Sequence, residues 1–523
     1  MTAQAAPAGN SARLGLYALI AALPFTDFLQ TGLVAFGAAP IMGELGASPQ
    51  DYSLVATAYA VVAIGVIANH RWLLERLGWR TLMAASAIAL ALGALVCAFS
   101  GSLLAFGLGR VTMALGCASF MTAGRVLVQH IPPSPRRFTG IKFFAAGLAW
   151  GLVAGPLLAA QALALYGWRA SFLALLVPAV AIASLAICVL DDQLSLEHTA
   201  RSQSHPVGLL ALMGGSFLLL HGLQQSGFDY FDRPAVLWTG VVLGVGVLSA
   251  SVLMHGRGVV RPLIRFQALV QSRYLVGLAV FTVAYMVLGA NNLMLPVLLQ
   301  RALGVPLEIV GRFLALGALG SVLTWIVLSR LLPRHPGPTR YYLAGFGALL
   351  LCGVQLARLS ESANPWSSAM PALLCNGAFV ILVLATTAMQ TFQTVPQDEA
   401  TFSHANQVKN MLAQFGVAAG MALATLCLQW RGSVRATGLG ESLAAANPVA
   451  QQTLDGLTQY FATHGDPGVA PRMALAQLGQ WVVQEATFMA ALDYFALVAA
   501  FACVCLVVVL MQAAVAPLRG RWR

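Results

Sequence analysis

The chain has 523 residues, of which 59% are hydrophobic and only 9% are charged, and its formal net charge is +11. A soluble globular protein carries about 25% charged residues, so this composition excludes a soluble chain and predicts one whose apolar exterior is covered by lipid. The basic residues stand in small groups between apolar runs and form no basic-aromatic surface, which argues against nucleic-acid binding.

The first apolar run follows Arg13 and continues past Asp27. Because no clear A-x-A cleavage site ends it, we interpret this run as a membrane span and not as a signal peptide. A helix needs about 20 mostly apolar residues to cross a bilayer, and runs of this length exclude the alternating pattern of a membrane β-barrel. We predict fourteen transmembrane helices, near residues 14–36, 52–69, 81–100, 103–128, 140–163, 170–190, 207–223, 234–254, 274–298, 308–329, 341–359, 367–391, 405–429 and 488–514.

Lysine and arginine are distributed unevenly over the loops between these spans. If both termini are cytoplasmic, the opposite side holds seven of the 29 basic residues, and Arg110, Arg125 and Arg312 fall within spans. The cytoplasmic side holds the other 19, which are Arg13, Arg71, Arg76, Arg80, Arg136, Arg137, Lys142, Arg201, Arg257, Arg261, Arg265, Arg273, Arg330, Arg334, Arg340, Lys409, Arg519, Arg521 and Arg523. This bias follows the positive-inside rule and predicts a multi-pass protein of the inner (plasma) membrane with both termini cytoplasmic.

One segment lacks the character of a span. Residues 431–486 are polar and contain Pro448, Pro467 and Pro471. We expect an external loop here, with one or two short amphipathic helices.

The turn between the second and third spans carries a pattern of charges. Arg71, Glu75, Arg76, Gly78 and Arg80 follow one another closely, and such charges can pair and latch neighbouring helices together. The turn resembles the G-x-L-a-D-r-x-G-r-r signature of the major facilitator superfamily. Arg71 stands in place of the leading Gly, and Glu75 in place of the Asp.

Two further patterns lie in the fourth and fifth spans. Arg110 begins a stretch similar to the family motif R-x-x-Q-G-x-G, with Met113 in place of the Gln. Gly151, Gly155 and Pro156 resemble the glycine-rich motif that the family's antiporters carry in span five.

The order of these motifs over nearly the full length is similar to that of the fourteen-spanner drug:proton antiporter family. The resemblance implies an all-α polytopic membrane protein with the major facilitator fold in a 6+2+6 arrangement. Residues 1–190 would form the N-terminal six-helix bundle, 191–256 an inserted two-helix pair, and 257–523 the C-terminal six-helix bundle with its external loop 431–486. The implied partners are the lipid bilayer, a small organic substrate and protons, and a periplasmic adaptor is left open. Two six-helix bundles of this kind suit alternating access around a site near the midplane.

Asp27 is the one acidic residue that we place deep within a predicted span. A carboxylate in hydrocarbon must face a wet cavity, pair with a cation or take up a proton, so Asp27 is a candidate for proton coupling. Arg110 is its expected partner. The alternatives are that Asp27 forms a fixed ion pair or lies at the interface, and that Arg110 only anchors the helices. Arg125 is expected to snorkel or latch near the cytoplasmic end.

Polar and aromatic side chains within the spans are candidates for a substrate cavity, because buried amides are costly where they face lipid. Amides that only tie helices together are the alternative reading. Tyr59 is the strongest candidate, because it matches a Ser-Tyr position of the family. His221, Gln224 and Gln225 at the end of span seven are expected to be interfacial, and Asp493 structural. The cavity candidates are Gln30, Thr31, Tyr59, Tyr285, Asn291, Asn292, Asn376, Gln390, Asn410 and Gln414.

No sequence motif for catalysis emerges. The chain lacks a Walker loop and an H-E-x-x-H pair, and its nine histidines are dispersed. We therefore expect no enzyme, no cofactor and no metal site. The resemblance implies a proton-coupled exporter of amphipathic organic compounds or drugs. The alternatives are transport of organic anions, lipids or siderophore-like metabolites by the same fold, or a non-transporting membrane sensor.

Overall fold

The computed structural model describes residues 10–191, 202–229, 233–256, 264, 269–360, 364–393, 395, 398–443 and 448–520. Over these ranges the chain is helical and contains no strand. Fourteen helical segments of the described chain are long and apolar enough to cross a membrane, which confirms the predicted all-α class and number of spans. Six residues of the predicted cytoplasmic set lie outside the described ranges: Arg201, Arg257, Arg261, Arg265, Arg521 and Arg523.

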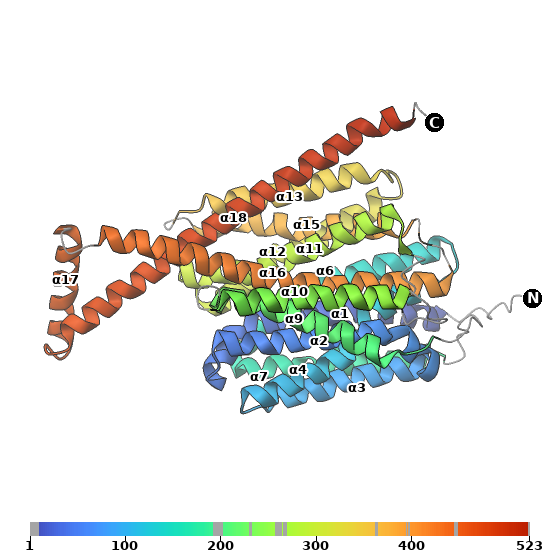
Figure 1. Ribbon diagram of the computed structural model, residues 1–523, viewed down its shortest axis with the longest axis horizontal. Helices are drawn as coiled ribbons and strands as arrows, with labels where there is room; N and C mark the ends of the chain where they lie inside the picture. The colour runs from blue at the N-terminus through green and yellow to red at the C-terminus, as the bar shows by residue number, and fades with distance from the viewer. Residues whose placement is uncertain are drawn as a thin grey trace, which may run out of the picture.

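Six spans precede residue 191, and the fourth and sixth of them are each built from two consecutive helices (Figure 1). Their helices are α1 (Asn10–Leu45), α2 (Pro49–Leu77), α3 (Trp79–Ala98), α4 (Leu103–Cys117), α5 (Phe120–His130), α6 (Pro135–Tyr166), α7 (Trp168–Ala174) and α8 (Leu176–Val189). Two more spans follow as α9 (Pro206–Asp229) and α10 (Pro234–Gly256).

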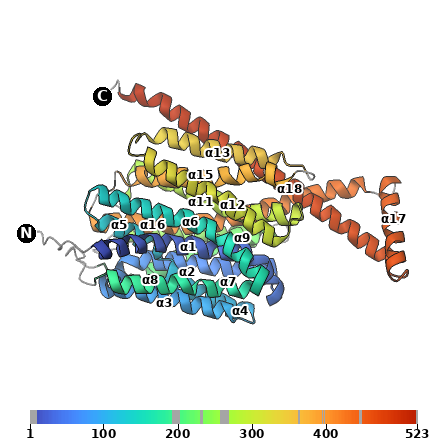
Figure 2. The ribbon, with the colours of Figure 1, turned by 180° about the vertical axis from the view of Figure 1, so that it is seen from behind.

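The last six spans begin at residue 272. Their helices are α11 (Ser272–Pro296) with its π-helical continuation η2 (Val297–Ala302), α12 (Leu307–Leu331), α13 (Pro338–Ala357), α14 (Pro365–Ser368) with α15 (Met370–Thr391), α16 (Glu399–Ser442) and α18 (Ala470–Gly520). The start of α1 and the end of α18 lie at the same end of the molecule, as an even number of spans requires (Figures 1 and 2).

The helices pack in two groups. In the first group α1 packs on α5, α6 and α8, and α3 packs on α4 and α8; in the second, α11 packs on α16, α12 on α15, and α13 on α15 and α18. The groups meet along two seams, α6 against α12 and α2 against α16. Helix α9 packs on α10, α2 and α16, so it covers the second seam.

The segment expected as an external loop is mostly a continuation of two spans. Helix α16 has 44 residues and α18 has 51, and both project beyond the other helices, where α17 (Pro448–His464) joins them (Figure 1). Pro448 is the first residue of α17 and Pro471 the second of α18, so these prolines begin helices, where no backbone N–H is required of them. The predicted loop is therefore wrong where α16 and α18 continue through 431–442 and 470–486, whereas a short helix expected within this segment is present as α17.

Two arginines of α16 hold Asp493 of α18 near the base of this projection. Nitrogen–oxygen distances of 2.8 Å join Asp493 to both Arg431 and Arg435. The expectation that Asp493 is structural fits this double ion pair.

Glycines of α6 allow its backbone to approach α1 closely. A Cβ on Gly147 would lie 2.0 Å from the carbonyl oxygen of Ala21, and one on Gly155 would lie 2.9 Å from the Cα of Gly32. Small residues permit this approach in membranes, where van der Waals packing holds helices together.

Replacing Gly147 with alanine should separate α1 from α6 and lower the midpoint of thermal unfolding in detergent. Overpacking of this kind costs about 1–3 kcal/mol. Gly43→Ala is the matched control on α1, because an added Cβ there meets nothing within 4 Å. Equal midpoints for the two variants would contradict the close α1–α6 contact.

Candidate central cavity

A cavity of about 490 Å³ lies between the two groups of helices. At one end its lining includes Pro49 at the start of α2 and Arg301 in η2, which are both exposed. At the other end Ile67, Met121 and Asn410 line it and are buried. The cavity therefore opens where α1 ends and α2 begins, and it is closed at the opposite end.

Gln30 of α1 organises the polar side chains of the first group. Its amide nitrogen donates to the hydroxyls of Tyr59 at 2.8 Å and Thr31 at 3.0 Å. Its amide oxygen accepts from Arg110 Nη1 at 3.0 Å, and the guanidinium lies 4.2 Å from the centroid of the Tyr59 ring. Arg110 is thus fixed by an amide and an aromatic face.

Asp27 lines the cavity, with 7% of its surface exposed. Its Oδ1 is buried and has no hydrogen-bond partner, and among the described residues no ion pair joins Asp27 to Arg110. The expected pairing of Asp27 with Arg110 is absent, because Gln30 takes the guanidinium. The carboxyl therefore stands at the cavity with a free oxygen.

Lys409 is a buried cation that the sequence analysis assigned to a cytoplasmic loop. It lies within α16 with 6% of its surface exposed, and its ammonium is 5.3 Å from the centroid of the Phe281 ring. It interacts electrostatically with Asp27 and Arg125. Its place inside the predicted span 405–429 was the signal that could have found it.

Amides of the second group tie α11, α15 and α18 together. Asn291 donates to Asn376 Oδ1 at 2.7 Å and accepts from the Tyr494 hydroxyl at 2.8 Å. On α16, Asn410 donates to Thr122 Oγ1 of α5 at 2.8 Å. Several amides that line the cavity thus also join helices, as the alternative interpretation expects.

The structure brings most of the predicted cavity residues to one place. Gln30 lies behind the lining, bonded to Thr31 and Tyr59. Gln390 lies elsewhere: it does not line the cavity, and it accepts from the exposed Arg273. The predicted residues that line the cavity are Asp27, Thr31, Tyr59, Arg110, Tyr285, Asn291, Asn292, Asn376, Asn410 and Gln414.

Gln224 of α9 is a lining residue that the sequence analysis placed at the interface. It is 6% exposed, and its side-chain oxygen accepts from Thr57 Oγ1 of α2 at 2.9 Å. Because α9 contacts both α2 and α16, it forms one wall of the cavity.

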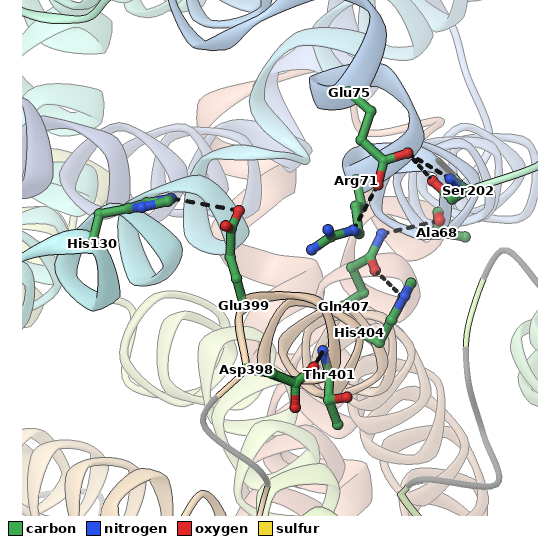
Figure 3. Close-up of polar contacts among 10 residues, drawn as sticks. All are labelled: Ala68, Arg71, Glu75, His130, Ser202, Asp398, Glu399, Thr401, His404 and Gln407. Atoms are coloured by element: carbon green, nitrogen blue, oxygen red, sulfur yellow. Dashed lines mark hydrogen bonds and ion pairs between the residues drawn. The ribbon is translucent and has the colours of Figure 1, made fainter. Parts of the chain in front are cut away.

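The closed end is held by the first turns of α16 against α2 and α5. Gln407 donates to the carbonyl oxygens of Ile67 at 2.9 Å and Ala68 at 3.1 Å. His130 Nε2 of α5 lies 3.8 Å from a carboxylate oxygen of Glu399, and Figure 3 shows this contact together with that of Gln407 and Ala68. Each contact joins the first helix group to the second.

The charged last turns of α2 and the turn that follows them also lie at this end. Arg71 pairs with Glu75 at 2.8 Å, and Glu75 accepts from the backbone N–H of Ser202 at 2.7 Å (Figure 3). Arg80 donates to the carbonyl of Leu190 at 2.9 Å. These bonds tie the turn to the end of α8 and to the segment before α9.

Two further residues stabilise this end of α2, one through its backbone conformation and the other through contact with an aromatic ring. Gly78 ends α2 with φ of +79°, a conformation that other residues rarely adopt. The Arg76 guanidinium lies 4.5 Å from the centroid of the Trp72 ring.

Comparison with known proteins agrees with this geometry. The family model described as the Major Facilitator Superfamily matches residues 20–425. The chain belongs to the Major Facilitator Superfamily. It is therefore a membrane transporter and not an enzyme.

Curated relatives resemble the chain in sequence, and solved structures resemble it in fold. A Klebsiella pneumoniae (strain 342) protein named "Putative multidrug resistance protein MdtD" is 24% identical over 407 residues, covering 77% of this chain and 84% of its own. A bacterial homolog of the human lysosomal transporter Spinster, in an inward-facing state, has a TM-score of 0.53 at 16% identity, covering 97% and 98%. A bacterial homologue of the human drug peptide transporters PepT1 and PepT2 has a TM-score of 0.57 at 14% identity, covering 98% and 99%.

Two serines test which end of this major facilitator protein is open. Ser53 lines the cavity and is half-buried, whereas Ser403 of α16 is buried at the closed end with 2% exposed. In a background that carries Cys188→Ala and Cys503→Ala, we expect a charged thiol reagent to label Ser53→Cys more than about tenfold faster than Ser403→Cys, because labelling requires an accessible thiolate. The reverse order would show that the opposite end is open.

Proposed function

We propose that this chain is a proton-coupled secondary transporter of the inner membrane that exports amphipathic organic compounds by alternating access. The observation that carries this proposal is a cavity between two helix groups, open at one end, with the buried carboxyl of Asp27 in its lining. The names of the relatives, which speak of multidrug resistance, support a drug-like substrate.

The lining of the cavity suits an amphipathic molecule. Phe28, Phe36, Tyr285 and Met121 supply apolar and aromatic surface, and the amides named above supply hydrogen bonds. A volume of about 490 Å³ lies in the range of sites for drug-sized ligands. A mixed lining of this kind binds by shape and apolar area and leaves a few polar groups to orient the ligand.

Asp27 is the proposed site of proton coupling. An ionised carboxylate without a cation in contact is costly in a bundle interior, so its charge state and the hydration of the cavity depend on each other. In the open state Asp27 can take a proton through the mouth of the cavity. In the alternate state the same carboxyl faces the other side and gives the proton up.

Alternating access follows from the two seams. With both termini cytoplasmic, the mouth near Pro49 faces outward and the closed end at Glu399 faces the cytoplasm. If the two helix groups rock about the contacts of α6 with α12, α16 separates from α2 and α5 and the mouth closes. This movement is expected for two bundles that enclose a site near the midplane.

A second candidate function, transport of organic anions, is favoured by one observation. Arg110 and Lys409 are both buried beside a cavity whose lining includes a single described carboxylate, Asp27. With Arg301, which also lines the cavity, these are three cations against one acid, and the net positive charge attracts an anionic substrate.

Replacing Asp27 with asparagine tests the coupling. In proteoliposomes with a pH gradient, substrate-dependent proton flux should fall by at least about tenfold in Asp27→Asn, because the amide cannot take up the proton. Asp455→Asn on α17 is the matched control, since this acid is exposed and far from the cavity. Flux that survives Asp27→Asn would remove Asp27 from the mechanism.

The same assay, run with cationic and anionic amphiphiles of one skeleton, separates the two candidate functions. Flux with the cationic or neutral member supports drug export. Flux with the anionic member alone supports the second candidate, and the absence of flux with every member would contradict both.

A further inference from the structure

Lys409 has no role in the motifs of the sequence or in the coupling step proposed above. It is 6% exposed and stands over the ring of Phe281, a residue of α11 that is itself 2% exposed. A buried ammonium is strongly destabilising unless an opposite charge compensates it, and a single cation–π contact compensates only part of this cost. The charged form of the lysine is therefore favoured only in a state in which an opposite charge lies near it.

Asp27 is the acid in a position to supply that charge. Lys409 lies within electrostatic range of Arg125 and Asp27, and of these two only Asp27 is acidic. The ring of Tyr285 stacks on Phe281 with centroids 6.4 Å apart and also lies within electrostatic range of Asp27. Lys409, Phe281 and Tyr285 thus lie in one row, and Tyr285 lines the same cavity as Asp27.

The remaining groups around this pair do not compete with Asp27. Arg110 of α4 and Arg125 of α5 are cations. Tyr59 of α2, Cys117 of α4 and Tyr285 of α11 also face Asp27, and phenol and thiol groups are uncharged near neutral pH. Among these groups, which lie on α1, α2, α4, α5, α11 and α16, Asp27 is the one carboxyl.

The closed end of the cavity is held by the helix turn that carries Lys409. Asn406 donates to the carbonyl of Thr122 at 3.1 Å and Asn410 to its hydroxyl at 2.8 Å. Gln407 donates to the carbonyl oxygens of Ile67 and Ala68 in the C-terminal half of α2, and Figure 3 shows the bond to Ala68. A force on Lys409 therefore acts directly on the contacts that shut this end.

We propose that Lys409 is a positioning residue whose attraction to ionised Asp27 holds α16 closed against α2 and α5. When Asp27 takes a proton from the cavity, the attraction is lost and an uncompensated ammonium remains at the seam. Helix α16 then separates from Thr122, Ile67 and Ala68, and the closed end opens. This inference rests on the proposed function, because it states how protonation of Asp27 is converted into movement.

A double-mutant cycle with a labelling reporter tests this coupling. The reporter is Ser403→Cys, whose buried position on α16 becomes accessible when the closed end opens. With Lys409 present, Asp27→Asn should raise the labelling rate roughly tenfold, because it mimics the protonated acid. In the Lys409→Gln background labelling should already be fast, and Asp27→Asn should change it by less than about twofold.

Two control variants keep the test specific. Lys409→Arg keeps the charge and should preserve most of the effect of Asp27→Asn. Lys142→Gln removes the other lysine of the chain, which lies on α6 over Phe138, and should leave labelling unchanged. An equal acceleration by Asp27→Asn with and without Lys409 would overturn the proposal.

Folding gives a second measurement if Lys409→Gln is poorly produced. Removal of both charges leaves no buried ion unpaired, so Asp27→Asn with Lys409→Met should yield monodisperse protein. Failure of this double variant, with Asp27→Asn alone folded, would show that Lys409 acts independently of Asp27.

The labelling assay needs no substrate, so it separates this inference from the function it rests on. If no substrate drives proton flux but the double-mutant cycle still shows coupling between Asp27 and Lys409, only the transporter proposal is overturned. Flux that depends on Asp27, together with additive labelling effects, would overturn the role of Lys409 alone.

Discussion

The proposed mechanism depends on ionic groups that are buried where the two helix groups meet. These groups cannot all be paired at once. Asp27 has a free oxygen, Arg110 is satisfied by Gln30, and Lys409 stands over an aromatic ring. The surroundings of each group lower the free-energy cost of burying its charge but do not remove that cost. A protein that kept one conformation would gain by replacing such groups with apolar ones, so their presence points to a second conformation in which the charges have other partners.

Helix α16 connects the parts of the molecule that must move together. Its first turns close one end through Gln407, its middle lines the cavity through Asn410 and Gln414, and Arg431 binds α18 near the far end. A continuous helix of 44 residues transmits a displacement at one end to the other, because its backbone hydrogen bonds resist bending. The partners of α16 at its two ends belong to different helix groups, so it is placed to couple their movements.

The sequence sufficed for the features that composition and periodicity control. The fourteen spans follow from the length of apolar runs, and most cavity candidates follow from the cost of polar groups in lipid. The partner of Arg110 could not be predicted, since the choice between Asp27 and Gln30 depends on side-chain direction within one turn of α1. Gln390 was misplaced for a related reason, because its depth along α15 brings it beside Arg273 and away from the cavity.

In the proposed mechanism, protonation of Asp27 moves the two helix groups from the state with an open mouth to the state that is open at the opposite end. Pulsed spin-label distances measure this directly, with one pair at Ser134→Cys and Arg334→Cys beyond the closed end and another at Ser102→Cys and Glu308→Cys beside the mouth, all exposed positions. On passing from alkaline to acidic pH the first distance should lengthen and the second shorten, and Asp27→Asn should show the acidic distances at both pH values. Distances that do not change in opposite directions, or that still respond to pH in Asp27→Asn, would contradict the account.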